Sequence, residues 1–226
     1  STFAHVGPFD RYIKGDGISK PDSIVSYTRK DIIAFYQGLE PRFSFRYLLP
    51  DNSSIKAGYA YNYQYVHLVT LSAVSLPTDI WFPTTDQAKP ERGFQTSIGY
   101  FRNFDKDRYE ASVELYYKGM KNLIEFKEGA LPGDNVNDNT DNLLVYGDGW
   151  AYGTEFFLKK TEGAFTGWIG YTWAKTERRF PDINEGNVYP AKYDRRHDLT
   201  LVGTYKPNDT WTFGASFIYA TGNTLT

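Results

Sequence analysis

The chain has 226 residues and a formal net charge of -2, from 25 Lys and Arg against 27 Asp and Glu. This balance gives no electrostatic reason to expect a nucleic-acid partner. Cys is absent, which excludes a disulfide framework and a thiolate metal site. The mean hydropathy is -0.52, and no apolar run reaches the roughly 18 residues of a membrane-spanning helix.

This composition is still compatible with a membrane barrel. Only every second residue of a barrel strand meets lipid, so the mean hydropathy of such a chain stays low. Aromatic residues make up 18% of the chain. They favour both strands and the boundary between lipid and water, where an apolar ring can carry a polar tip.

The first clear hairpin is predicted over residues 42–65. Aromatic and polar residues alternate there with a period of two, which puts them on opposite faces of a strand. Four turn-forming residues, Pro50-Asp51-Asn52-Ser53, separate the two strands. One face carries Phe43, Phe45, Tyr47, Ile55, Ala57, Tyr59, Tyr61, Tyr63 and Tyr65, and the other carries Arg42, Ser44, Arg46, Ser54, Lys56, Gly58, Ala60, Asn62 and Gln64.

The same alternation predicts three further hairpins, with turns at 105–108, 161–163 and 207–210. Trp168 breaks the pattern. The apolar faces include Tyr109, Val113, Leu115, Tyr117, Trp150, Phe156, Leu158, Ile169, Trp173, Phe213 and Phe217, and the opposite faces include Glu110, Glu114, Glu155 and Lys159.

Short turns alternate with long loops at roughly 66–93, 119–148 and 176–194. Outer-membrane barrels have this arrangement, with short turns at the periplasmic end and long loops outside. A soluble β-sandwich also alternates, but its inner face favours Val, Ile and Leu, and its strands are shorter. We therefore predict an all-β fold, an antiparallel up-and-down transmembrane β-barrel.

The strand count predicts an incomplete barrel. About nine strands are expected, whereas single-chain bacterial barrels normally have an even number and close on themselves. The N-terminus lacks the basic start and apolar stretch of a signal peptide. An exported protein with this start is expected to be mature, or part of a longer chain.

Two sets of residues are candidates for contact with a solute. Charged residues of the polar faces are expected to line a wet lumen, where the simplest role is to contact water and pair across strands. Aromatic residues of the long loops could contact a solute, although loop packing is the simpler role. The first set is Arg42, Arg46, Lys56, Glu110, Glu114, Glu155 and Lys159, and the second is Trp81, Phe82 and Tyr189.

Catalytic and metal sites are not predicted. His197 is flanked by Asp194 and Asp198, but strand alternation separates His197 from both, so a charged cluster fixing the outer end of a strand is favoured. The oxygen-rich stretch 134–141 does not follow the calcium-loop order. Hydrolase, zinc-protease and phosphate-loop motifs do not occur, and no cofactor is predicted.

Two segments resemble one family of proteins. Tyr189-Pro190-Ala191-Lys192-Tyr193-Asp194-Arg195-Arg196-His197-Asp198-Leu199 resembles a segment near the C-terminus of TonB-dependent outer-membrane receptors, particularly those of Bacteroidota-like bacteria. Gly149-Trp150-Ala151-Tyr152-Gly153-Thr154-Glu155 is similar to a strand start of the same receptors. The spacing between these two segments also agrees, and so does the loop segment Leu76-Pro77-Thr78-Asp79-Ile80-Trp81-Phe82-Pro83.

The resemblance implies a barrel of about 22 strands around an N-terminal plug, in the outer membrane of a Gram-negative bacterium. It also implies uptake of a scarce nutrient, powered by the TonB complex through the plug. Residues 1–226 would then form part of the barrel domain, without plug or final strands. The implied partners are outer-membrane lipid, the rest of the barrel, the plug, TonB and a small nutrient. A passive porin-like or structural barrel, and a β-rich surface adhesin, remain the alternatives.

Overall fold

The structure, a computed structural model, describes residues 1–13, 23–69, 80–129 and 140–222. Their regular secondary structure is β-strand, apart from two short 3-10 helices, η1 (Thr140–Leu143) and η2 (Asn184–Gly186). No helix in the described ranges is long and apolar enough to cross a membrane.

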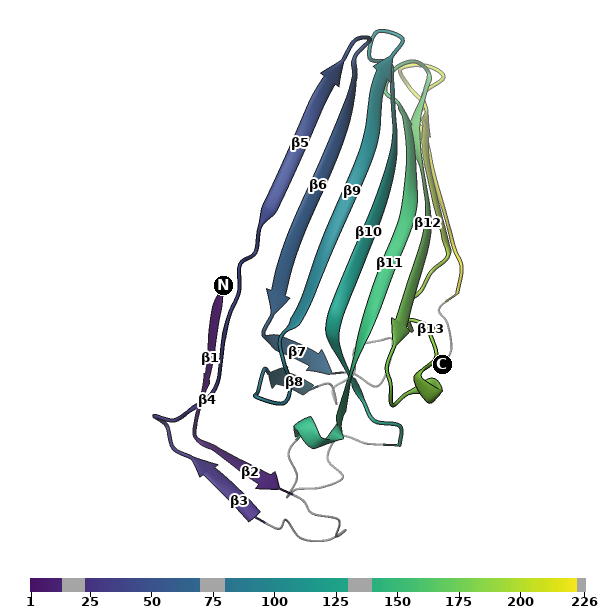
Figure 1. Ribbon diagram of the computed structural model, residues 1–226. Coiled ribbons are helices and arrows are strands. Elements are labelled where there is room, and N and C mark those ends of the chain that lie inside the picture. Colours follow the sequence, from purple (N-terminus) through teal and green to yellow (C-terminus); the bar gives the residue numbers. More distant parts are fainter. Residues whose placement is uncertain (14–22, 70–79, 130–139, 223–226) are drawn as a thin grey trace.

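One antiparallel sheet dominates the molecule (Figure 1). Its long strands follow one another in chain order, each paired with its neighbours through hairpins, and the two-residue strand β13 (Tyr189–Pro190) pairs with β12. The long strands are β5 (Arg42–Leu49), β6 (Ser53–Gln64), β9 (Glu91–Phe104), β10 (Tyr109–Phe126), β11 (Leu144–Lys160), β12 (Phe165–Arg179), β14 (His197–Tyr205) and β15 (Phe213–Ala220).

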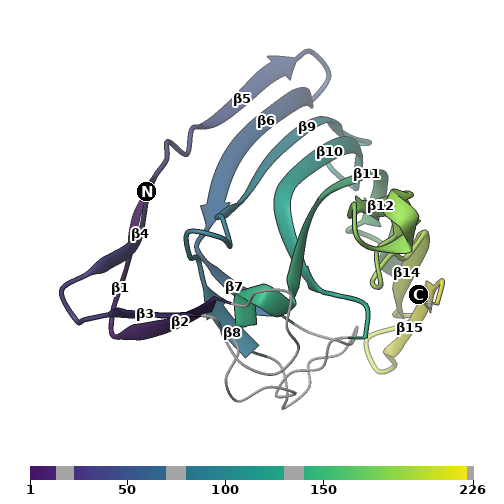
Figure 2. The same cartoon turned by 60° about the horizontal axis from the view of Figure 1, so that its bottom comes forward.

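The sheet curves into an arc, as a segment of a barrel wall does (Figure 2). Three two-stranded sheets lie toward the opposite end from the short turns (Figure 1). They pair β1 (Thr2–Val6) with β4 (Ile32–Gln37), β2 (Phe9–Ile13) with β3 (Ser23–Tyr27), and β7 (Val66–Val69) with β8 (Ile80–Pro83).

Short turns all lie at one end of the sheet and long connections at the other (Figure 1). The turns are built by residues that tolerate a positive φ, such as Asp51 (62°) and Asn52 (53°) between β5 and β6. Asp105 and Asp107 do the same between β9 and β10, with φ of 54° and 64°. The predicted alternation of short turns and long loops is therefore confirmed.

The apolar rows predicted from the period of two form one continuous face. Leu115 stands between Ile98 on β9 and Thr154 on β11, and Val113 stands between Tyr100 and Phe156. Leu115 and Ile98 are 52% and 53% exposed, so the described chain leaves this middle part of the face uncovered. Exposed aliphatic and aromatic side chains in register across eight strands are typical of a surface in contact with lipid.

The long strands extend further than the sequence predicted. The expected loop 119–148 is instead strand as far as Phe126 and again from Leu144, so the described connection between β10 and β11 is much shorter. A bulge at Asn122, whose φ is 58°, shifts the register between Lys121 and Leu123 and interrupts the alternation. The expected loop 66–93 likewise contains β7 and β8, and 176–194 contains the end of β12 and β13.

Beyond this bulge, both faces of β10 and β11 are covered, and the described core lies there. One face packs Ile124, Phe126 and Leu144 against Val69 and Phe82 of the β7–β8 hairpin. The other face packs Leu123 and Val145 against Phe180 and Tyr189. Strands buried on both faces have continuous apolar runs and no alternation, which is why the sequence pattern failed here.

Candidate functional site

One row of residues across the polar face of the sheet changes from basic to acidic. Register places Arg46 opposite Lys56, and Glu114 opposite Glu155, with Gly99 of β9 between the two pairs. The row continues through Thr172 to Asp198. This row is therefore basic at β5 and β6 and acidic at β10, β11 and β14, and like charges stand directly opposite each other in both of its charged pairs.

Two basic side chains of β5 and β6 contact groups that are not carboxylates. Arg42 Nη2 donates a hydrogen bond of 2.8 Å to Asn62 Oδ1. Lys56 Nζ lies 4.0 Å from the centre of the Phe101 ring, within the range of a cation–π interaction. Glu110 stands opposite Lys159 in the register, the one pair of opposite charges among the seven predicted lumen residues that share a register position.

A hollow of about 690 Å³ at the short-turn end brings three of the seven predicted lumen residues together. Arg46, Lys56 and Glu110 line it with Phe101 and Asp107. Arg42, Glu114, Glu155 and Lys159 lie on the same face of the sheet but outside this hollow.

A second polar pocket of about 220 Å³ lies where the same face approaches the long loops. Three strands that are distant in sequence supply its amide, acidic and basic groups: Asn62, Gln64, Glu91, Gln95 and Lys118, with Met120 beside them. None of these residues is among the solute contacts predicted from the sequence. Their signal was weak, because only the cross-strand register shows that polar positions beside two different long loops share one pocket.

Glu91 connects this pocket to a buried polar cluster. Its Oε1 is 3.5 Å from Nδ1 of His67, which is 1% exposed. The other ring nitrogen of His67 is 3.1 Å from Thr84 Oγ1, and the Thr84 carbonyl is 3.1 Å from His5 Nδ1. Tyr36 donates to the Thr85 carbonyl at 2.8 Å. These contacts attach the β1–β4 sheet to the segment that precedes β9.

The three predicted loop aromatics lie in different surroundings. Trp81 is 68% exposed, whereas Phe82 is 8% exposed and belongs to the core with Val69 and Ile124. Tyr189 is 9% exposed, with its ring centre 6.3 Å from that of Phe180. Leu76 to Asp79, the first part of the loop motif, lies outside the described residues.

Tyr189 also belongs to an ionic cluster at the loop end. Arg178 pairs with Glu125 and donates to Tyr193 Oη at 2.6 Å, while the Tyr189 hydroxyl donates to Glu125 Oε2 at 3.3 Å. Burial, and then the negative charge of Glu125, raise the pKa of the Tyr189 hydroxyl. The cluster ties β10, β12 and the β12–β14 connection together, which gives Tyr189 a packing role in this structure.

The charged segment around His197 fixes the outer end of β12. Asp194 Oδ1 accepts the backbone N–H of Thr176 at 2.6 Å, and Arg196 pairs with Asp194 at 3.0 Å. His197 Nδ1 is 2.8 Å from the Tyr171 hydroxyl. Within the described ranges, no group of three or more His, Asp or Glu side chains could hold a metal ion.

Comparisons with solved structures concern the fold. The FrpB iron transporter from Neisseria meningitidis has a TM-score of 0.57 and 14% identity, covering 80% of this chain and 26% of its own. The ferric-catecholate import receptor Fiu from E. coli has a TM-score of 0.56 and 19% identity, covering 92% and 29%. The ferripyoverdine receptor of Pseudomonas aeruginosa has a TM-score of 0.52 and 13% identity, covering 91% and 27%.

The chain therefore spans between 26% and 29% of the length of these receptors. None of the comparisons tests the expected likeness to receptors of Bacteroidota, which stays a prediction. No curated protein matches in a sequence search. A family model described as TonB dependent receptor-like, beta-barrel matches residues 12–226.

Proposed function

Because the chain belongs to the TonB-dependent receptor-like β-barrel family, we propose that it forms part of the wall and outer loops of a receptor for energy-coupled nutrient uptake. Family membership places the chain in the outer membrane of Gram-negative bacteria, among transporters and not enzymes. The plug, the contact with TonB and the rest of the barrel belong to the proposal, since the chain spans about a quarter of its solved relatives.

The polar pocket at the loop end of the inner face is the observation that carries this proposal. A receptor needs hydrogen-bonding groups where a solute enters, and Asn62, Gln64 and Gln95 supply amides there. Lys118 adds an exposed positive charge. The opposite face of the same strands is apolar and exposed, as the wall of a membrane channel requires.

We propose a ferric chelate as the substrate class. The similar structures are named as an iron transporter, a ferric-catecholate import receptor and a ferripyoverdine receptor. Ferric catecholates are anionic, and a Lys at the pocket would attract them, with its effect screened by salt. The exposed Trp81 would offer an aromatic surface near the same end.

Uptake of a radiolabelled ferric catecholate by cells carrying the intact receptor tests the proposal. We expect uptake that requires the receptor gene and is abolished by deletion of TonB. Replacing Lys118 by Gln is expected to weaken binding about fivefold, in line with one lost charge interaction at a surface. Lys121→Gln is the matched control, because Lys121 is on the same strand but pairs with Asp148 on the other face at 2.5 Å.

Uptake that continues without TonB would support a passive porin and contradict energy coupling. An intact receptor that stays monodisperse in buffer without detergent would instead indicate a soluble or adhesive protein. If Lys118→Gln and Lys121→Gln bind the ferric catecholate as well as the parent does, the pocket is not the site of capture.

A further inference from the structure

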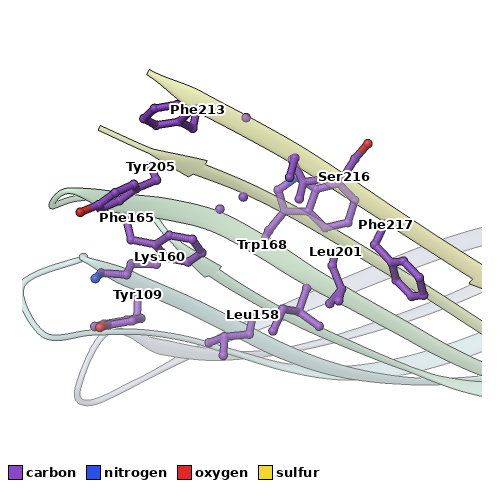
Figure 3. A pocket seen from close by; sticks show the side chains of 16 residues that line it. Tyr109, Leu158, Lys160, Phe165, Trp168, Leu201, Tyr205, Phe213, Ser216 and Phe217 are labelled. Carbon is purple, nitrogen blue, oxygen red and sulfur yellow. The ribbon is translucent and has the colours of Figure 1, made fainter. Parts of the chain in front are cut away.

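A groove of about 540 Å³ crosses the apolar outer face of β12, β14 and β15. Figure 3 shows Phe165, Tyr205, Lys160 and Tyr109 around one end, and Leu158, Leu201 and Phe217 along the far side. The side chains of Phe165, Phe213 and Phe217 are each 55% exposed, so within the described chain nothing fills the groove. Its volume lies within the roughly 300–1,000 Å³ typical of sites for small molecules.

The strand register builds this groove from three rows. Gly167, Gly203 and Ala215 stand side by side on β12, β14 and β15 and form the floor. The row nearer the turns is Phe165, Tyr205 and Phe213. On the other side Ile169, Leu201 and Phe217 form the second wall. Small residues between two rows of large ones leave an apolar channel between the two walls.

The floor is held by a close approach of two backbones. Gly167 has a φ of 155°, and a Cβ there would lie 2.1 Å from the carbonyl oxygen of Val202. At Gly203, a Cβ would lie 3.3 Å from the Phe165 ring, which leans over the floor from the first wall. The close approach of the two backbones therefore fixes the floor of the groove.

Lys160 provides a positive charge at the end of the groove nearest the turns. It is the last residue of β11, directly before the 161–164 turn, and its Nζ is 5.9 Å from the centre of the Tyr109 ring. The same Nζ lies 3.7 Å from where a Cβ of Gly163 would be, so the ammonium group reaches toward the turn. In barrels of this kind short turns face the periplasm, which puts Lys160 at the level of the headgroups of the periplasmic leaflet.

We propose that this groove binds one acyl chain of an anionic phospholipid from the periplasmic leaflet, with the lipid phosphate on Lys160. The apolar channel and the cation at its headgroup end complement the two parts of such a molecule. The walls, the floor and the charge all belong to this one groove. This site is independent of the solute pocket, which lies on the inner face at the opposite end of the sheet.

Native mass spectrometry of the intact receptor, delipidated in detergent, provides the test. The probes are dioleoyl phosphatidylglycerol and dioleoyl phosphatidylcholine, which share their acyl chains and differ in net charge. We expect one tightly retained phosphatidylglycerol, and about fivefold weaker retention after Lys160→Gln. Lys159→Gln is the matched control, because the neighbouring Lys159 has the same charge and points to the inner face.

A second variant tests the groove itself. Ala215→Phe would fill the floor, so it is expected to lower retention of both lipids while solute uptake continues. Equal retention of phosphatidylglycerol by Lys160→Gln, Lys159→Gln and the parent would overturn the proposal. So would a second protein chain that crosslinks to position 215 and excludes lipid from the groove.

Discussion

At the scale of single residues, two residues that are adjacent in the sequence but differ in exposure allow a direct comparison. Trp81 is 68% exposed and Phe82 is 8% exposed, although both are large aromatic residues of β8. The strand alternation places them on opposite faces of the hairpin. Composition alone would treat them as equivalent, whereas the structure gives them different roles.

We predict that Phe82→Ala destabilises the β7–β8 hairpin by about 3 kcal/mol, because it leaves a cavity among Val69, Ile124 and Leu144. Trp81→Ala removes an exposed ring and should leave stability within about 0.5 kcal/mol. Limited proteolysis of the intact receptor in urea would measure both changes. Equal protease sensitivity of the two variants would contradict this assignment.

At the scale of elements, glycines decide how closely β12 and β14 approach each other. We predict that Gly167→Ala prevents correct pairing of these strands, because its Cβ would clash with the Val202 carbonyl. Gly214→Ala on β15 is the control, since a Cβ there meets nothing within 4 Å. The yield of protease-resistant receptor in isolated outer membranes checks the prediction. A normal yield of Gly167→Ala would show that the two backbones can separate.

The boundaries of the strands show where the alternation of apolar and polar residues predicts structure correctly. The hairpins over 42–65 and 94–117 could be predicted, because each strand there has one lipid face and one wet face. The outer ends of β10 and β11 could not, since Leu123, Ile124 and Phe126 are covered from both sides and a bulge intervenes at Asn122. Trp168 broke the pattern for a local reason: it lies on the inner face, with its ring 5.9 Å from that of Phe157.

The candidate sites could be predicted from the sequence only in part, because strand pairing decides which residues come together. Alternation identified which charges share the inner face, including Arg46, Lys56 and Glu110, which line one hollow. The loop-end pocket joins positions 62, 91 and 118, and their proximity depends on the pairing of β6, β9 and β10. Sequence alone does not specify that register where loops of unknown geometry intervene.

For the whole molecule, the central requirement is that one face of the wall meets lipid and the other meets water. Ile98, 53% exposed, and Ser97 are adjacent on β9 and belong to opposite faces. We predict that Ile98→Arg destabilises the receptor in lipid vesicles by about 2–4 kcal/mol, while Ser97→Arg costs less than about 1 kcal/mol. Unfolding by urea in phosphatidylcholine vesicles, followed by Trp fluorescence, measures both free energies.

The reverse order of these two values would mean that the faces are assigned the wrong way round. Equal and small effects would instead indicate that neither face contacts hydrocarbon. In either case, the outer groove would not face lipid and the inner pocket would not face an enclosed lumen, so both proposals would fail.

The length of β10 and β11 has a consequence for how such a protein can vary. At about 3.3 Å per residue, strands of 18 and 17 residues are considerably longer than the roughly ten residues that a bilayer requires. The surplus forms a stalk that is stiffened by packing on both sides and ends at Phe126 and Leu144. Substitutions at the tip of this stalk would lie away from the barrel wall. The surface that is recognised could therefore change in sequence while the strands that insert into the membrane stay the same.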